Sequence, residues 1–176
     1  LEGEQLQAYL HDVEIVQRFA ALNRACILEE ICKGMKWKAI DRFDTVHNYV
    51  AKLQDGTPLL RKGAVSAQQG ERLLIPINMK EGMLLCEGKE NPDWNFSAPH
   101  GAGRVYRRDQ VKEHFTVSDY KREMKGIYST CISRDTLDEA PFAYRSAEEI
   151  MEQIEETVRI RKILRPVYNF KAGGNR

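Results

Sequence analysis

A short segment around one histidine carries residue types that suit phosphoryl chemistry. The run from Pro99 to Arg104 reads PHGAGR. Glycines let a backbone turn tightly and approach a ligand closely, and an imidazole beside such a turn can act as a nucleophile or as an acid and base. We therefore take His100 as the candidate nucleophile. From spacing alone, an ordinary glycine turn before a solvated basic helix stays an open interpretation, since a lone GxG is a weak signal.

Arginines follow this turn at helical spacing. We expect a helix from Gly103 to about Phe115, so Arg104 and Arg108, four positions apart, would share one of its faces. The first amides of such a helix would face an anion. This arrangement predicts a local anion site next to His100.

Other candidates are ambiguous when each is taken alone. His47 stands in an extended, mostly apolar segment, so it is a metal ligand or a core residue, and one ligand does not make a site. Lys62 is a phosphate contact or part of a charged turn. Asp138 and Glu139 would coordinate a metal or face water, and we favour water. Lys171 is a solvated lysine near the C-terminus, or it is held in place by the aromatic-rich stretch that it follows.

Periodicity predicts the elements that position these residues. We expect a long helix over about 4–34 and an extended segment over 37–50. The Asp55-Gly56 turn predicts a hairpin of 48–53 with 57–61. We expect two strands between 73 and 86, a loop over 87–99 and a short helix over 119–125. Ser146 begins a capping box, and the helix after it would extend to Pro166, with Val158 on its apolar stripe. With no linker visible, we expect a single α+β unit.

Composition and charge exclude several classes. With 42% hydrophobic residues the chain is not disordered or fibrous, and with a net charge of +1 it is not a globally basic nucleic-acid binder. No apolar run is long enough to span a membrane, and the polar start has no signal peptide. Each cysteine lies in an apolar stretch, which predicts buried free thiols in a reducing, cytoplasmic compartment. The cysteines are Cys26, Cys32, Cys86 and Cys131.

An ordered series of motifs resembles the RtcB family of RNA-splicing ligases. The motifs are HNY (47–49), RKGA (61–64), IPINM (75–79), APHGAGR (98–104), DEAPFAY (138–144) and YNFKA (168–172). The match runs from about Tyr9 to Lys171, and Asn23-Arg24 resembles the family's A-x-x-N-R helix.

The resemblance implies a reaction. The family joins RNA ends that carry a 3′-phosphate or a 2′,3′-cyclic phosphate to 5′-hydroxyl ends, using GTP and two Mn²⁺ ions. It implies that His100 becomes guanylylated and that His47 binds manganese. It also implies RNA ends as partners, with an archease-like activator as a candidate. The implied nucleotide contacts are Asn78, Gly101, Ala102, Gly103, Tyr144 and Lys171, and the implied contacts to RNA or phosphate are Lys62, Arg104 and Arg108.

The chain also departs from the family pattern. Asn78 stands in PINM where PGSM is usual, Met83 replaces a common serine, and Arg107 replaces a serine beside Arg108. These changes leave the choice of substrate open. The family's other metal ligands, in a D-x-G-C-type motif and two further histidines, do not occur among the 176 residues. We therefore expect the chain to be the C-terminal part of a larger catalytic domain.

Two alternatives stay open beside the ligase. The first is a non-catalytic relative that binds RNA ends or a partner protein, in which binding through the arginines would weaken with salt. The second is a nuclease or phosphatase that uses His100 as an acid and base, which hydrolysis without GTP would reveal.

Overall fold

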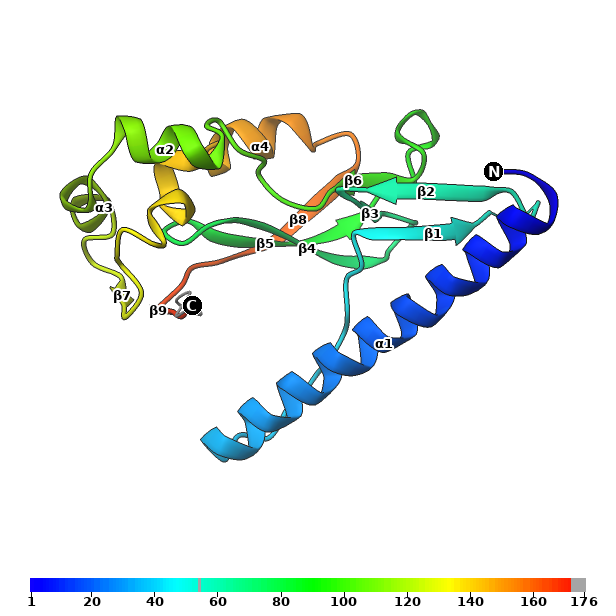
Figure 1. Cartoon of the computed structure of the whole chain (residues 1–176), viewed down its shortest axis with the longest axis horizontal. Helices are drawn as coiled ribbons and strands as arrows, with labels where there is room; N and C mark the ends of the chain where they lie inside the picture. Colours follow the sequence, from blue (N-terminus) through cyan, green and yellow to red (C-terminus); the bar gives the residue numbers. More distant parts are fainter. Residues whose placement is uncertain (54, 172–176) are drawn as a thin grey trace. The chain divides into compact units, whose positions relative to one another are not determined.

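The computed structural model describes residues 1–53 and 55–171, so Ala172 of the YNFKA motif lies outside the described residues. Helices and small, mostly antiparallel sheets alternate along the chain, which confirms the α+β class. The chain divides into two compact units, 1–64 and 65–176 (Figure 1). That all 176 residues form one catalytic domain stays a prediction.

The first unit holds a long helix and a hairpin, as predicted. Its elements are α1 (Gly3–Met35), β1 (Asn48–Lys52) and β2 (Pro58–Lys62). The strands pair antiparallel, with Asn48 opposite Lys62. The segment between α1 and β1 has no regular structure up to His47. It is fixed to the helix by Arg24, whose guanidinium reaches both carboxylate oxygens of Asp44 at 2.9 and 2.6 Å.

Helix α1 forms where its apolar spacing predicts it but buries none of its residues. Val16 of the predicted stripe is 64% exposed. Cys26 and Cys32 both lie on this helix, where Cys26 is exposed and Cys32 is half-buried. The prediction of buried thiols was therefore wrong for both. It was correct for Cys86 and Cys131, and all four thiols are free.

The second unit centres on an antiparallel sheet in the order β4-β5-β8. The bounds of its elements are β3 (Ala64–Ser66), β4 (Arg72–Asn78), β5 (Gly82–Gly88), η1 (Pro92–Trp94), β6 (Ser97–Pro99), α2 (Arg108–His114), α3 (Val117–Glu123), β7 (Tyr128–Ser129), η2 (Leu137–Glu139), η3 (Pro141–Ala143), α4 (Ala147–Gln153), β8 (Val158–Leu164) and β9 (Tyr168–Asn169). Strand β3 pairs with β6, and β7 pairs in parallel with β9.

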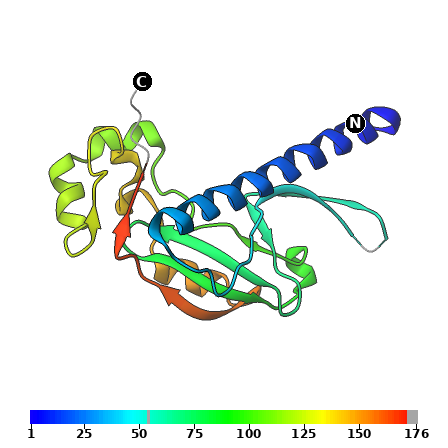
Figure 2. The ribbon, with the colours of Figure 1, turned by 90° about the horizontal axis from the view of Figure 1, so that it is seen from below.

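Two hydrophobic clusters hold this unit together. In the first, Ile150 and Ile154 from the α4 region pack on Ile75 and Leu84 of the sheet. Figure 2 shows α4 lying along one face of that sheet. The second cluster joins α2, α3, η2 and η3 around Tyr120. Tyr144 packs against both clusters, so it stands at their junction.

The last predicted helix was wrong beyond its first two turns. Ser146 does form the capping box with Glu149, but α4 ends at Gln153 and residues 158–164 form β8. The stretch VRIRKIL alternates β-branched and basic residues, which suits a strand, and pairing with β5 satisfies its backbone. Val158 lies four positions after Ile154, so it matches the apolar spacing of the helix although it belongs to a strand. Val158 does enter the first core cluster, but as a strand residue.

Among the described residues, no helix combines the length and apolar character that a membrane crossing requires.

Candidate functional site

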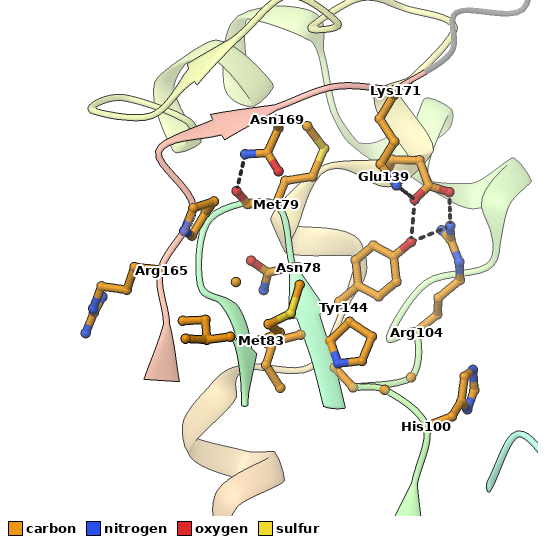
Figure 3. Close-up of a pocket in the computed structure, with 18 of the residues that line it drawn as sticks. Asn78, Met79, Met83, His100, Arg104, Glu139, Tyr144, Arg165, Asn169 and Lys171 are labelled. Atoms are coloured by element: carbon orange, nitrogen blue, oxygen red, sulfur yellow. Dashed lines mark hydrogen bonds and ion pairs between the residues drawn. The ribbon is translucent and has the colours of Figure 1, made fainter. Parts of the chain in front are cut away.

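A cavity of about 940 Å³ opens in the second unit, between the β4–β5 turn, the segment after β6 and the chain that follows β8. Nine of the eleven residues predicted for the site line it. They are Asn78, His100, Gly101, Ala102, Gly103, Arg104, Arg108, Tyr144 and Lys171. Figure 3 shows His100 and Lys171 at opposite ends of this lining, with Arg104 and Tyr144 between them. The fold therefore gathers segments that are up to 93 positions apart in the sequence (171 − 78).

The glycine turn is held against β4 by its backbone. The amide of Ala102 donates to the carbonyl of Pro76 at 3.1 Å. A Cβ at Gly101 would lie 3.1 Å from the same Pro76 oxygen, so glycine allows this close approach. Gly103 adopts a φ of +70°, in the left-handed region that favours glycine. His100 is exposed at the start of this turn.

The helix was predicted to begin at Gly103, directly after the turn, and this starting position was wrong. Arg104 forms a β-bridge with Tyr144, and the amide of Val105 donates to the carbonyl of Ala143 at 2.9 Å. These pairings draw the chain along a neighbouring segment, so α2 begins only at Arg108. The helix amides consequently do not follow His100, and Arg104 and Arg108 do not share a helix face. Their side chains nevertheless approach the same carboxylates.

Those carboxylates are Asp138 and Glu139, which sequence reasoning placed in water. Glu139 Oε1 lies 2.8 Å from Arg104 Nη2, and Glu139 Oε2 lies 3.0 Å from Lys171 Nζ. Arg108 approaches both acids at 3.8 Å, too long for a hydrogen bond, and its side chain is 74% exposed. Three cations therefore face two carboxylates, which leaves an excess of one positive charge.

Tyr144 completes this cluster. Its hydroxyl donates to Glu139 Oε2 and accepts from Arg104 Nη2, both at 2.8 Å. The Arg104 guanidinium carbon also lies 4.6 Å from the centre of the Tyr144 ring. Burial, together with the hydrogen bond to Glu139, raises the pKa of Tyr144 to about 12. The phenol is thus a neutral donor at physiological pH.

The electrostatics of Glu139 reflect opposing effects. Burial acts to raise the pKa of Glu139, but hydrogen bonds from Tyr144 and Lys171 and the charges of Lys171 and Arg104 outweigh it, so this pKa lies below its ordinary value. Glu139 is therefore ionised at neutral pH.

Asn78 lines the cavity, but its side chain forms hydrogen bonds within the turn between β4 and β5. Asn78 Oδ1 accepts from the amides of Lys80 and Glu81 at 3.0 and 2.9 Å, and its Nδ2 donates to Glu81 Oε2 at 2.6 Å. Glu81 Oε1 in turn accepts from the amide of Ala147, at the start of α4, at 3.0 Å. The predicted nucleotide contact stays a prediction, and the structure gives Asn78 a clear structural role.

Replacing Asn78 by alanine is expected to lower the free energy of unfolding by about 1–3 kcal/mol, because two turn amides and Glu81 lose their partner. Denaturant unfolding of the intact protein measures this, with the exposed Gln69→Ala as a control that should change little. Equal stability of the two variants would show that the turn does not depend on Asn78.

His47 and Lys62 belong to the first unit, where the hairpin brings them together. His47 is exposed and immediately precedes Asn48, the partner of Lys62 across the hairpin. Asn48 Oδ1 accepts from the amide of Gly63 at 2.9 Å, which closes this end. The HNY and RKGA motifs thus meet at one end of β1 and β2. Their roles toward metal and phosphate stay predictions.

Manganese fits this chain only in part. Mn²⁺ is bound mainly by oxygen ligands, and His47 would offer a single imidazole nitrogen. Within residues 1–53 and 55–171, however, no three His, Cys, Asp or Glu side chains are grouped to hold a metal ion. These residues would therefore supply a fraction of a metal site.

Sequence reasoning missed Glu139 as the centre of the charged cluster and Asn169 as a support of Lys171. Asn169 Nδ2 donates to the carbonyl of Met79 at 2.7 Å and so ties the segment before Lys171 to the residue that follows β4 (Figure 3). Both residues stand inside quoted motifs, DEAPFAY and YNFKA. The available signal was their position in these motifs, five and two residues from Tyr144 and Lys171.

Comparison with known proteins agrees with the motif series. The family model described as tRNA-splicing ligase RtcB matches residues 1–172, so the chain belongs to the RtcB family. It is 31% identical to the RNA-splicing ligase RtcB of Escherichia coli K12, over 95% of this chain and 44% of that protein. It is 31% identical to the RNA-splicing ligase RtcB of Mycobacterium tuberculosis, over 92% of this chain and 44% of that protein.

Another relative is less similar in sequence. The tRNA-splicing ligase RtcB of Thermococcus kodakarensis is 28% identical, over 88% of this chain and 39% of that protein. The chain thus spans less than half the length of these curated relatives.

Proposed function

We propose that this chain supplies the guanylate-accepting part of a GTP- and Mn²⁺-dependent RNA ligase that joins 3′-phosphate or 2′,3′-cyclic phosphate ends to 5′-hydroxyl ends. The single observation that carries the proposal is the shared cavity, in which His100, Tyr144 and Lys171 lie with the arginines. The printed names of the relatives, RNA-splicing and tRNA-splicing ligase, support the same class.

In the proposed first step, a ring nitrogen of His100 forms a bond to the α-phosphorus of GTP. The bond from that phosphorus to the bridging oxygen breaks, and pyrophosphate leaves with the electron pair. A 2′,3′-cyclic phosphate end is first opened by water, which adds to phosphorus as the bond to the 2′-oxygen breaks, to give a 3′-phosphate and a 2′-hydroxyl. An oxygen of the RNA 3′-phosphate then displaces the imidazole and takes the guanylate. Finally the 5′-hydroxyl oxygen attacks the 3′-phosphate, loses its proton, and GMP leaves. His100 suits this role because it is exposed at the start of a turn that is hydrogen-bonded to β4 through Ala102 and Pro76.

The cations of the cavity support the transfer of a phosphoryl group. Arg104 is held by Glu139 and by the Tyr144 hydroxyl, so its position is fixed before a nucleotide binds. Arg108, being 74% exposed, has donors that can reach a phosphate oxygen. The excess positive charge of the cluster would offset charge that develops on the α-phosphate.

The metal would be bound by His47 together with ligands outside the described residues. When bound, Mn²⁺ would act as a Lewis acid toward the phosphate oxygens.

The direct test is transfer of label from α-labelled GTP to the intact protein in the presence of Mn²⁺. We expect a covalent adduct that is stable to alkali and labile to acid, as a nitrogen–phosphorus bond is, and no adduct after chelation of the metal. RNA with a 3′-phosphate and a 5′-hydroxyl should then be joined. An unlabelled protein, or an adduct that survives acid, would contradict the proposal.

A second candidate function is RNA-end binding without catalysis. The position of Met83 in the cavity lining favours it, because an apolar side chain stands where the family commonly has serine. It predicts RNA binding without guanylate transfer. Since Arg107 and Arg108 are exposed while Arg104 is engaged by Glu139, salt dependence should come mainly from the first two.

A further inference from the structure

Glu139 is the point at which three separate segments of the chain converge. It ends η2, and its side chain is only 22% exposed. It accepts from Arg104 Nη2 at 2.8 Å, from the Tyr144 hydroxyl at 2.8 Å and from Lys171 Nζ at 3.0 Å. Both carboxylate oxygens are used, and each donor comes from a different part of the cavity wall (Figure 3).

The donors depend on Glu139 to different degrees. Arg104 keeps other partners without it, since its Nη1 donates to the carbonyl of Asp138 and Asp138 Oδ2 lies 3.8 Å from its Nη2. Among the interactions of the described residues, Lys171 has Glu139 as its one ion-pair partner. The hydroxyl of Tyr144 has Glu139 as its acceptor. Loss of the carboxylate would therefore release Lys171 and the Tyr144 hydroxyl far more than Arg104.

A carboxylate by itself is a poor contact for a triphosphate, because like charges repel. Its useful action in an anion-binding cavity is to fix the cations and donors around it. A lysine has four rotatable side-chain bonds, and fixing its ammonium before a ligand arrives removes a conformational cost from binding.

We propose that Glu139 is a positioning residue that holds Lys171 and the Tyr144 hydroxyl in place for the guanine nucleotide. This inference rests on the proposed function and deepens it. It assigns Glu139 no direct contact with the nucleotide, and it explains why two residues 27 positions apart (171 − 144) act on one ligand.

The test is Glu139→Gln in the intact protein, measured as the initial rate of His100 guanylylation against GTP concentration. Glutamine keeps the size and loses the charge. We expect the KM for GTP to rise about 10- to 100-fold, as for lost hydrogen bonds between charged groups, while kcat changes less than about threefold. A merely structural defect would instead reduce the active fraction, and so kcat, without raising KM. The exposed Glu152→Gln on α4 is the matched control and should leave both constants unchanged.

A double-mutant cycle identifies the partner. Lys171→Met should also raise the KM for GTP. Glu139→Gln added to Lys171→Met should raise it by a smaller factor than Glu139→Gln does alone, because the part that acts through Lys171 is already lost and only the part that acts through the Tyr144 hydroxyl remains. Glu139→Asp, which keeps the charge, should recover part of the loss. Full additivity of the two effects would overturn the inference.

Inosine triphosphate, which lacks the exocyclic amine of guanine but keeps its N1–H, tests whether Glu139 contacts that amine. If Glu139 only positions its neighbours, Glu139→Gln should raise the KM for both nucleotides by the same factor. A loss confined to GTP would mean that Glu139 contacts the base, which overturns the positioning role. An unchanged KM in a wild type that labels normally would overturn this inference alone. A wild type that does not label would overturn it together with the proposed function.

Discussion

His100→Ala is expected to abolish transfer of guanylate from α-labelled GTP, with a loss of at least about 10³-fold, because no other atom of the turn can form the covalent bond. RNA joining should fall in parallel, since the guanylate is the intermediate. The variant should fold normally: His100 is exposed, and substitutions of exposed residues usually change stability by less than about 0.5 kcal/mol.

The control for this variant is His11→Ala, which removes an exposed imidazole from α1. It should label at the wild-type rate. Thermal unfolding of the intact proteins should show equal midpoints for the wild type and both variants. Label that persists in His100→Ala would place the nucleophile elsewhere and would remove the chemical basis of the ligase proposal.

Gly82→Ala is expected to destabilise the protein severely, by about 3 kcal/mol or more. Gly82 begins β5, with a φ of +85° that side chains rarely adopt. A Cβ there would lie 2.0 Å from the carbonyl oxygen of Leu164 and 2.9 Å from Cδ of Pro166. Leu164 pairs with Met83 in the β5–β8 ladder, so the oxygen cannot move without breaking strand pairing. The cavity wall formed by Gly82, Met83 and Leu164 would be lost with it.

Gly126→Ala provides the matched control for the backbone alone. Gly126 has a φ of +95°, but nothing lies within 4 Å of the position that a Cβ would take. We expect a cost of about 1–2 kcal/mol, the penalty of a left-handed conformation. Denaturant unfolding of the intact protein measures both. If Gly82→Ala and Gly126→Ala lower the free energy of unfolding equally, the contact with Leu164 does not destabilise Gly82→Ala. The close packing of β5 on β8 would then have to be rejected.

The elements that the sequence predicted correctly are those with local signals. The apolar spacing of α1, the Asp55-Gly56 turn and the Ser146 capping box each act within a few residues. For the same reason the failure at residues 158–164 is informative. Val158 fits a helical stripe and a strand equally well, and the choice was made by the exposed edge of β5, which lies 70 or more positions earlier (158 − 88).

The candidate site shows the same division. The motif series by itself determined the family, because residue identity and order are properties of the sequence. Nine of the residues that the motif series named line one cavity, and their roles stay predictions. The engagement of Asn78 in a turn and the pairing of Arg104 with Tyr144 were decided by tertiary contacts.

Glu139 illustrates why tertiary structure was needed. Its neighbours in sequence left a choice between a metal ligand and a solvated side chain. Its partners in space are a bridge residue, a half-buried phenol and a lysine near the end of the described chain. A carboxylate takes its role from the donors that the fold brings within about 3 Å of it. Helices, turns and motif identity follow from short-range chemistry, while that convergence of donors exists only once the sheet and its connecting segments have packed.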